Sequence, residues 1–309
     1  MNNFSEKIAI LTGDPNGIGA EITIKALNLL NLPTKDLIII SNSKILNRYG
    51  KLDNNYKIEE VDYNAKIEPG QKTAEAGDFA FRCLKMVCEI KPKFIVTAPT
   101  SKEAMHMSGH HYSGQTEILE KFLARDDQKA EMLFVANDFR VLLLTRHMAL
   151  KDINLSQEVV YEKILRLRSF MQNKLGIKNP SFALCALNPH AGENGILGME
   201  EIEILIPAVE TLREQGVNIT NPLPADTLFV KGANSYLKGE KLPYDCYIAC
   251  YHDQGLIPIK TIASKKTVNM TIGLDSIRTS PCHGTAFDIA GKNLADPESM
   301  IEAIKACFT

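Results

Sequence analysis

The segment Asp245–Lys260 has the sequence DCYIACYHDQGLIPIK. Its apolar first half, Cys246–Cys250, predicts a short buried strand, and the polar residues after it, with a glycine and a proline among them, predict a loop. His252 stands where the strand passes into that loop. Because ligands of open α/β sheets bind at the carboxyl ends of the strands, the segment predicts a parallel sheet that carries His252 into a crevice.

Two further apolar runs end in the same way. Val141–Thr145 precedes His147, and Phe182–Leu187 precedes His190. If all three strands are parallel, their histidines converge at one edge of the sheet, and three imidazoles with an open position are typical of a catalytic divalent-metal site, with zinc as the first choice. For any one of the three, the alternative is a strand-end histidine held by an ordinary hydrogen bond.

The composition is that of an ordinary globular protein. The chain has 309 residues, 45% apolar and 23% charged, enough for a large core divided between two lobes. A formal net charge of -2 gives no argument for nucleic acid or anionic membrane as a partner. The seven cysteines contain no Cys-x-x-Cys pair, and neither a secretion signal nor a membrane-spanning run is present. We therefore expect a cytoplasmic protein with reduced thiols that binds a small molecule.

A strand, a glycine-rich turn and a helix open the chain. Lys7–Leu11 predicts the strand, TGDPNGIG at 12–19 the turn, and a helix is expected from about Ala20 to Leu30. The turn lacks the Gly-x-Gly-x-x-Gly spacing, and the next strand, Leu37–Ile40, is not followed by an acidic residue that could hold a ribose. A Rossmann domain is therefore disfavoured, while a structural turn and a ligand-binding turn both fit.

Several polar residues at predicted loops are candidates for an anion site. Lys102 follows the strand Phe94–Thr97, and Gln115 and Thr116 begin a helix whose free N–H groups suit a phosphate or carboxylate. Helix capping alone also explains Thr116, and a solvated loop position explains Lys102.

Two cations, Lys260 and Arg278, fall close in sequence to strand ends and together suit a phosphate clamp, although surface salt bridges would explain either one. His106 and His110 are spaced as in a zinc helix, but the glutamate of His-Glu-x-x-His is missing, so neither they nor His111 is included among the metal ligands.

A set of longer motifs forms a family resemblance that covers nearly the whole chain. They are the turn at 12–19, GQTE at 114–117, LNPHAGE at 187–193, PADT at 224–227, YHDQG at 251–255, RTS at 278–280 and HGTAFDIAG at 283–291. In length and order they resemble the 4-hydroxythreonine-4-phosphate dehydrogenase family of pyridoxal phosphate biosynthesis.

The resemblance implies an α/β fold, a two-lobed three-layer sandwich of the isocitrate/isopropylmalate dehydrogenase type and not a Rossmann fold. We expect residues 1–114 and 258–309 to form one lobe with the nucleotide-binding loop, and 115–257 an inserted lobe with dimer contacts. A homodimer with its site at the subunit interface is implied, as are NAD or NADP and a divalent metal, zinc before magnesium or cobalt.

The resemblance also assigns residues to roles. It implies metal ligands at His147, His190 and His252. Substrate contacts are implied at Gln115, Thr116, Lys260, Asn269 and Arg278, and nucleotide contacts at His283, Gly284, Thr285, Asp288 and Gly291. His147 lacks a glycine-flanked loop, so we expect it to come from the opposite subunit to the other two metal ligands.

The implied reaction is the NAD(P)-dependent, metal-assisted oxidation of 4-phosphohydroxy-L-threonine to 2-amino-3-oxo-4-phosphooxybutanoate, which decarboxylates to 3-amino-2-oxopropyl phosphate. Asp253 and Lys102 are candidates for the group that accepts the hydroxyl proton.

Two departures loosen the substrate assignment: Gln115 stands where the family usually has histidine, and Cys282 where it usually has aspartate. A threonate 4-phosphate dehydrogenase is therefore an alternative. A nicotinamide-independent zinc hydrolase or lyase and a non-catalytic phosphate-binding module are alternatives of other classes.

Overall fold

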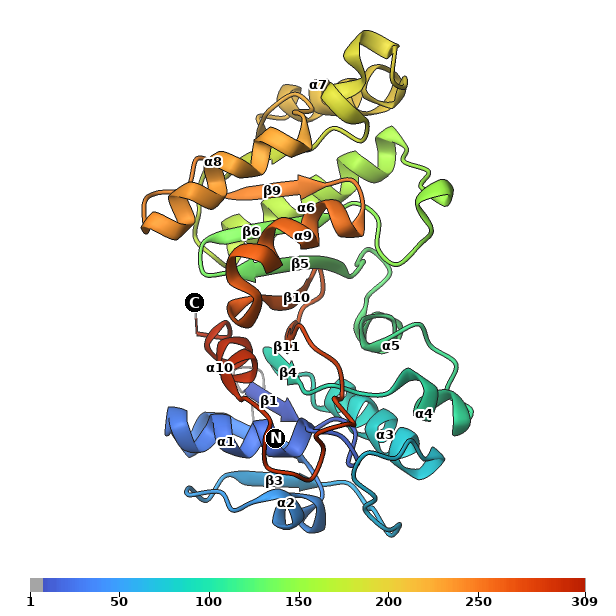
Figure 1. Ribbon diagram of the computed structural model, residues 1–309, viewed down its shortest axis with the longest axis vertical. Helices are drawn as coiled ribbons and strands as arrows, with labels where there is room; N and C mark the ends of the chain where they lie inside the picture. The colour runs from blue at the N-terminus through green and yellow to red at the C-terminus, as the bar shows by residue number, and fades with distance from the viewer. Residues whose placement is uncertain (1–7, 309) are drawn as a thin grey trace. The chain divides into compact units, whose positions relative to one another are not determined.

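The computed structural model describes residues 8–308 and separates into two compact α/β units (Figure 1). Within that range the first unit runs to Ala130 and resumes at Val268, and the second is Glu131–Thr267. Both boundaries between the units therefore differ from the expected ones, which followed residues 114 and 257. Helix α5 (Gln115–Leu123) packs against α3 (Ala74–Ile90) and belongs to the first unit, and helix α9 (His252–Ala263), which a boundary after residue 257 would divide, lies wholly in the second. No Gly- or Pro-rich linker marks these crossings in the sequence.

The sheet of the first unit has the strand order β3-β2-β1-β4-β11-β10. Its strands are β1 (Ile8–Leu11), β2 (Leu37–Ser41), β3 (Lys57–Glu60), β4 (Phe94–Thr97), β10 (Val268–Ile272) and β11 (Ile277–Pro281). All neighbours are parallel except β10 and β11, which run antiparallel. The expected first and second strands are confirmed within the described residues; Lys7, which was expected in the first, lies outside them.

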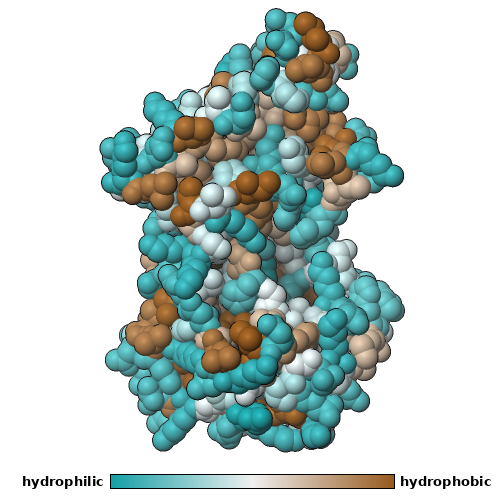
Figure 2. All heavy atoms as spheres, in the orientation of Figure 1, coloured by the Kyte–Doolittle hydropathy of each residue, from teal (hydrophilic) through white to brown (hydrophobic). Residues whose placement is uncertain are grey.

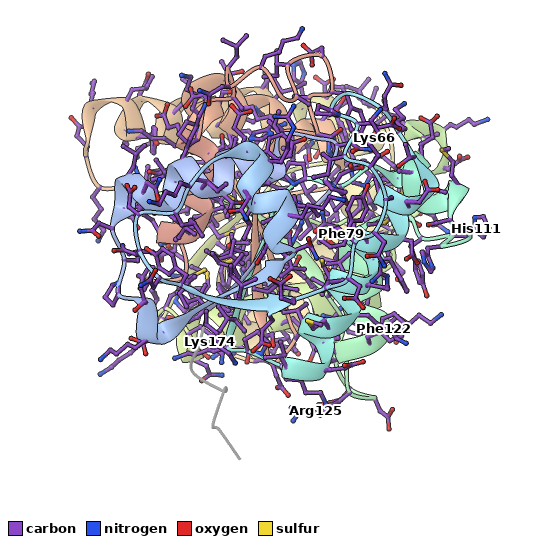
Figure 3. The ribbon with its side chains drawn as sticks, turned by 90° about the horizontal axis from the view of Figure 1, so that it is seen from below. Lys66, Phe79, His111, Phe122, Arg125 and Lys174 are labelled. Carbon is purple, nitrogen blue, oxygen red and sulfur yellow. The ribbon has the colours of Figure 1, made fainter. Side chains whose placement is uncertain are left out.

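Helices cover both faces of this sheet and make three layers. Ile8 and Ile10 of β1 pack in a core with α1 (Gly19–Leu30) and α10 (Glu298–Lys305), while Ala9 and Leu11 pack on the other face with α3. This alternation follows from the two-residue period of a strand. Figure 3 shows Phe79 of α3 in the interior. Two short helices complete the unit, α2 (Ser43–Tyr49) and α4 (Lys102–Met107).

The sheet of the second unit has the order β5-β6-β9-β7-β8. Its strands are β5 (Glu131–Ala136), β6 (Phe139–Leu143), β7 (Ser181–Leu184), β8 (Asn218–Ile219) and β9 (Cys246–Ala249). β5 and β6 form an antiparallel hairpin, and β6, β9, β7 and β8 are parallel. The three strands that precede the histidines, β6, β9 and β7, are therefore neighbours with their carboxyl ends at one edge, as the sequence predicts.

The helices of the second unit are α6 (Gln157–Asn173), α7 (Ile206–Glu214), α8 (Ala225–Lys238) and α9, and a π-helical turn, Glu201–Leu205, leads into α7. The loop predicted after Cys250 is wrong, because the residues from His252 onward form α9 with Pro258 inside it. Gly255 lets this helix lie close to β6: a Cβ atom there would be 2.7 Å from Leu143 Cδ2 and 2.8 Å from Val141 Cγ1. Its absence lets α9 pack directly on β6.

Candidate functional site

Arg278 of β11 is a buried cation. Its side chain is only 6% exposed, its Nε donates to Thr97 Oγ1 at 2.9 Å and its Nη2 donates to Gln115 Oε1 at 3.3 Å. Burial lowers the pKa of the guanidinium to about 10, so it stays charged at neutral pH. No salt bridge joins it to a carboxylate among the described residues, although the charge of Glu117, in the first turn of α5, acts on the guanidinium and partly offsets the effect of burial on its pKa. A desolvated guanidinium without a paired carboxylate is a strong site for an anion.

Gln115 supports this arginine. Besides accepting from Arg278, its amide Nε2 donates to Ala98 O at 3.1 Å and to Thr100 Oγ1 at 2.9 Å. Both ends of the amide are therefore engaged with groups of the protein. In this structure its side chain fixes the position of the guanidinium, and the expected substrate contact of Gln115 stays a prediction.

The amino terminus of α5 lies beside the same group. Gly114 precedes the helix without a side-chain cap, so the first N–H groups, those of Gln115 and the buried Thr116 among them, are directed out of the helix end. A Cβ atom placed on Gly114 would be 3.7 Å from Lys102 Cε, which locates the Lys102 side chain against this terminus. Lys102, Thr116 and Arg278 thus lie around this helix end in the first unit, together with one carboxylate, because Glu117 Oε2 would be 3.1 Å from the same Cβ atom.

Asn269 extends this cluster along β10. Antiparallel pairing sets Asn269 opposite Ser280 and Thr271 opposite Arg278, so Asn269 and Arg278 share a face of the sheet. The Oδ1 atom of Asn269 is buried and has no hydrogen-bond partner among residues 8–308. An acceptor of this kind is suited to a donor group of a ligand. Lys260, the remaining expected substrate contact, is an exposed residue of α9 in the second unit.

Two of the three expected metal ligands meet at the edge of the second sheet. The rings of His147, after β6, and His252, the first residue of α9, have centroids 5.1 Å apart. Nδ1 of His252 is 2.7 Å from Asp253 Oδ1. Because an ionised carboxylate only accepts hydrogen bonds, this contact assigns a proton to Nδ1, and in the neutral tautomer of that kind Nε2 carries the lone pair. Asp253 therefore orients His252, and its expected role as proton acceptor stays a prediction.

His190 is not part of that pair. It lies exposed in the turn Pro189–Gly195, with a left-handed backbone (φ 52°), and no group of three His, Cys, Asp or Glu residues in the described part of the chain is arranged to hold a metal. The expected grouping, with His147 on the opposite subunit to His252, does not agree with the ring contact between these two residues. The sequence could not separate the three, because each ends a strand of the same sheet.

The segment that carries His190 is anchored by a residue that sequence reasoning missed. The carboxylate of Glu201, which is 2% exposed, accepts from the backbone N–H groups of Leu187 and Asn188, each at 2.8 Å, and from the Asn188 side chain. Glu201 therefore holds the exit of β7.

The expected nucleotide-binding residues lie in an extended loop after β11, where His283, Gly284, Asp288 and Gly291 are exposed and Thr285 is half-buried. Thr285 O accepts from Ile18 N at 3.1 Å, which ties this loop to the amino terminus of α1. On the other side, a Cβ atom on Gly291 would be 2.8 Å from Pro69. These contacts place the loop against the glycine-rich turn.

The turn itself requires glycine for structural reasons, because Gly13 has φ +72° and a Cβ atom there would be 2.3 Å from Pro99 O. It also contains a second residue that the sequence did not single out. Asp14 is 0% exposed, its Oδ1 accepts from Asn16 N at 2.9 Å, and its Oδ2 has no partner among the described residues. Burial raises the pKa of this carboxyl to about 6.

The three histidines excluded from the metal set have contacts of their own. His110 Nε2 is 3.0 Å from Asp78 Oδ1, and its ring stacks on Phe81 with centroids 3.8 Å apart. The rings of His106 and His111 are 5.1 Å apart, and Figure 3 shows His111 at the periphery.

Known proteins with this fold define the class. An isocitrate dehydrogenase from Methylococcus capsulatus superposes with a TM-score of 0.52 at 13% identity, over 98% of this chain and 85% of that one, which shows a shared fold. A crystal structure of 4-hydroxythreonine-4-phosphate dehydrogenase from Klebsiella pneumoniae matches with a TM-score of 0.84 and 35% identity, covering 98% of this chain and 99% of that one. The expected α/β fold of the isocitrate dehydrogenase type is confirmed, and the chain is an oxidoreductase of the dehydrogenase class.

The family follows from the sequence matches. The family model described as "Pyridoxal phosphate biosynthetic protein PdxA" matches residues 7–307, and the chain belongs to this family. It is 39% identical to 4-hydroxythreonine-4-phosphate dehydrogenase of Sulfurihydrogenibium sp., covering 97% of this chain and 96% of the relative. It is 35% identical to D-threonate 4-phosphate dehydrogenase of Pectobacterium atrosepticum, covering 98% of each. In the described range no helix is long and apolar enough to cross a membrane.

Proposed function

We propose that this chain oxidises 4-phosphohydroxy-L-threonine with NAD or NADP, and that the resulting β-keto acid decarboxylates to 3-amino-2-oxopropyl phosphate for pyridoxal 5'-phosphate synthesis. The observation that carries the proposal is the buried Arg278 guanidinium, which is held by Thr97 and Gln115 and forms no salt bridge with a carboxylate among the described residues. Such a group suits a phosphorylated substrate, because a phosphate supplies the charge and the hydrogen-bond acceptors that the protein does not.

The other contacts of the substrate follow from the same cluster. We assign the phosphate to Arg278, to the N–H groups at the start of α5 and to Thr116, and we assign a donor group of the substrate to the vacant acceptor Asn269 Oδ1. Lys102, beside Gly114, remains the candidate for accepting the hydroxyl proton. Lys260 stays a proposed substrate contact because of the family motif alone.

The histidines fit a divalent cation. The free Nε2 of His252, fixed by Asp253, and the neighbouring His147 make a suitable pair of nitrogen donors for zinc. A bound metal would supply a Lewis acid that lowers the pKa of the substrate hydroxyl. We propose that His190 completes the set from the partner subunit, since it lies apart from the pair in its own chain.

An apolar surface next to His190 supports a homodimer. Ile196 is 78% exposed, and Leu197, Met199 and Ile202 are each more than 40% exposed. Figure 2 shows brown apolar residues over the segment near α7 that Figure 1 colours yellow. A second copy would cover these side chains and bring its own His190 segment to the first.

The two phosphorylated substrates named for relatives differ at C2, which carries an amino group in one and a hydroxyl group in the other. Because Gln115, beside Arg278, stands where the 4-hydroxythreonine-4-phosphate dehydrogenase family usually has histidine, D-threonate 4-phosphate remains the alternative substrate.

The test is absorbance of reduced nicotinamide with each of the two substrates, each dinucleotide, and zinc, magnesium or cobalt. A higher kcat/KM for the amino substrate supports the proposal, and a higher value for the hydroxy substrate selects the alternative. Absence of reduction with every combination would reject both, and release of inorganic phosphate without reduction would select the hydrolase.

A further inference from the structure

Thr271 of β10 has a buried hydroxyl group that the fold leaves without a partner. The residue is 0% exposed, and its Oγ1 forms no hydrogen bond with any group in the described part of the chain. Removing a hydroxyl from water without replacing its hydrogen bonds costs free energy, so such groups are uncommon in native proteins. Valine has nearly the same shape and would fill this position without that cost.

The sheet register places Thr271 next to the anion site. Thr271 lies directly opposite Arg278 in the antiparallel ladder of β10 and β11, so both side chains leave the same face, with Cβ atoms about 5 Å apart. Asn269, two residues earlier on the same face, has the second unsatisfied oxygen of this strand. The two vacant oxygens therefore flank the buried guanidinium on one side, while Thr97 and Gln115 hold it on the other.

The neighbouring residue Thr279 shows what a structural threonine looks like in the same ladder. It pairs with Met270, so its side chain points to the opposite face, and it is also 0% exposed. Its Oγ1 donates to Ala303 O at 2.7 Å and thereby joins β11 to α10. The two buried threonines differ in one respect: the fold uses the hydroxyl of Thr279 and leaves that of Thr271 vacant.

We propose that Thr271 is a further substrate-binding residue, whose hydroxyl donates a hydrogen bond to an oxyanion of the ligand that Arg278 binds. The hydroxyl can donate or accept, and the adjacent positive charge favours donation to an anion over acceptance from an ammonium group. This inference rests on the proposed function in taking the ligand to be a phosphorylated metabolite, and inorganic phosphate serves as the simplest probe.

The experiment compares Thr271→Val, Thr271→Ser and the matched control Thr279→Val in the full-length protein. Thr271→Val is expected to melt at the same temperature as the parent or higher, because a vacant polar group is removed. Its Kd for inorganic phosphate, measured by calorimetry and by the phosphate-induced shift in Tm, is expected to rise about tenfold. Thr271→Ser should keep phosphate affinity near that of the parent. Thr279→Val should lower Tm and leave phosphate affinity unchanged.

Two results would overturn the inference: a lowered Tm with unchanged phosphate affinity in Thr271→Val, or loss of affinity in Thr271→Ser equal to that in Thr271→Val. Phosphate binding by Arg278→Ala distinguishes an incorrect role for Thr271 from an incorrect anion site, on which the proposed function rests. If phosphate binding is lost in Arg278→Ala and kept in Thr271→Val, the anion site stands and Thr271 is not part of it. If neither variant changes phosphate binding, the anion site itself is wrong.

Discussion

The side-chain oxygen of Gln115 accepts a hydrogen bond from Nη2 of Arg278 at 3.3 Å, while the amide nitrogen of the same residue holds the exit of β4. Arg278 is therefore oriented by a neutral group that neither titrates nor competes for its charge. A long buried cation has many rotamers, and fixing one of them before the ligand arrives lowers the entropy lost on binding.

Gln115→Glu tests this relationship. The carboxylate has the shape of the amide but would pair with Arg278 and repel a phosphate, so KM for the phosphorylated substrate should rise more than tenfold. Gln115→Leu, which removes the support without adding charge, should raise KM by about tenfold. Steady-state kinetics at pH 7 measures KM for both variants. A larger rise in KM for Gln115→Leu than for Gln115→Glu would show that repulsion of the phosphate by the carboxylate is not the main effect.

Arg278→Ala should weaken binding of the phosphorylated substrate by about 2 kcal/mol, because its charge-assisted hydrogen bonds form in a desolvated position. The comparison is the same variant with an analogue that lacks the phosphate, whose binding should change little. Equal losses of affinity for the two ligands would show that Arg278 does not bind the phosphate group. Arg125→Ala, at an exposed ion pair with Asp275, is the matched control.

Asp253→Asn should lower zinc affinity by roughly ten- to a hundredfold, because the carboxylate that fixes the His252 tautomer is lost while the imidazole remains. Zinc titration with a competing chelator measures this without turnover. Asp138→Asn, at a carboxylate that is 85% exposed and paired with Arg140, should bind zinc like the parent. Unchanged zinc affinity in Asp253→Asn would show that Asp253 does not orient a ligand.

Mixed dimers test the grouping of the metal ligands. With His147 and His252 from one chain and His190 from the other, a dimer of His190→Ala with His252→Ala has one site with both lesions and one intact site. Its activity should approach half that of the parent dimer if the sites are independent. A dimer of His147→Ala with His252→Ala should recover none. The opposite pattern would place His147 across the subunit boundary from His252.

Asp14 predicts a pH dependence of stability. Burial raises its pKa from 3.8 to about 6 in the folded protein, so the folded state binds this proton more tightly than the unfolded state. The contribution of Asp14 to the free energy of unfolding is complete below pH 3.8 and is lost as the pH rises through about 6. The penalty at pH 7 is on the order of 3 kcal/mol.

Asp14→Asn should therefore increase the free energy of unfolding at pH 7, and the difference from the parent should shrink toward pH 4. Urea unfolding of both proteins at pH 4, 5.5 and 7 measures this difference. A difference that is constant across the three pH values would show that the Asp14 carboxyl does not titrate in this range.

Local patterns in the sequence determined the elements of the fold. The apolar runs Ile8–Leu11 and Cys246–Cys250 are properties of a few consecutive residues, and they predict strands buried on both faces. The structure places alternate residues of the first run in two cores, because side chains alternate across a sheet. The parallel edge where three histidines end their strands also followed, since parallel strands present their carboxyl ends together.

Only the tertiary structure decided how those residues are used. The rings of His147 and His252 meet, and His190 lies outside this pair, in a turn whose start is held by the Glu201 carboxylate. The close packing of the helix that starts at His252 depends on Gly255 lying against Leu143, more than one hundred residues away. Whether a polar group has a partner is likewise a property of packing: Thr279 and Thr271 are the same residue type on adjacent strands, and the path of the chain gives one a carbonyl oxygen and leaves the other beside a buried guanidinium.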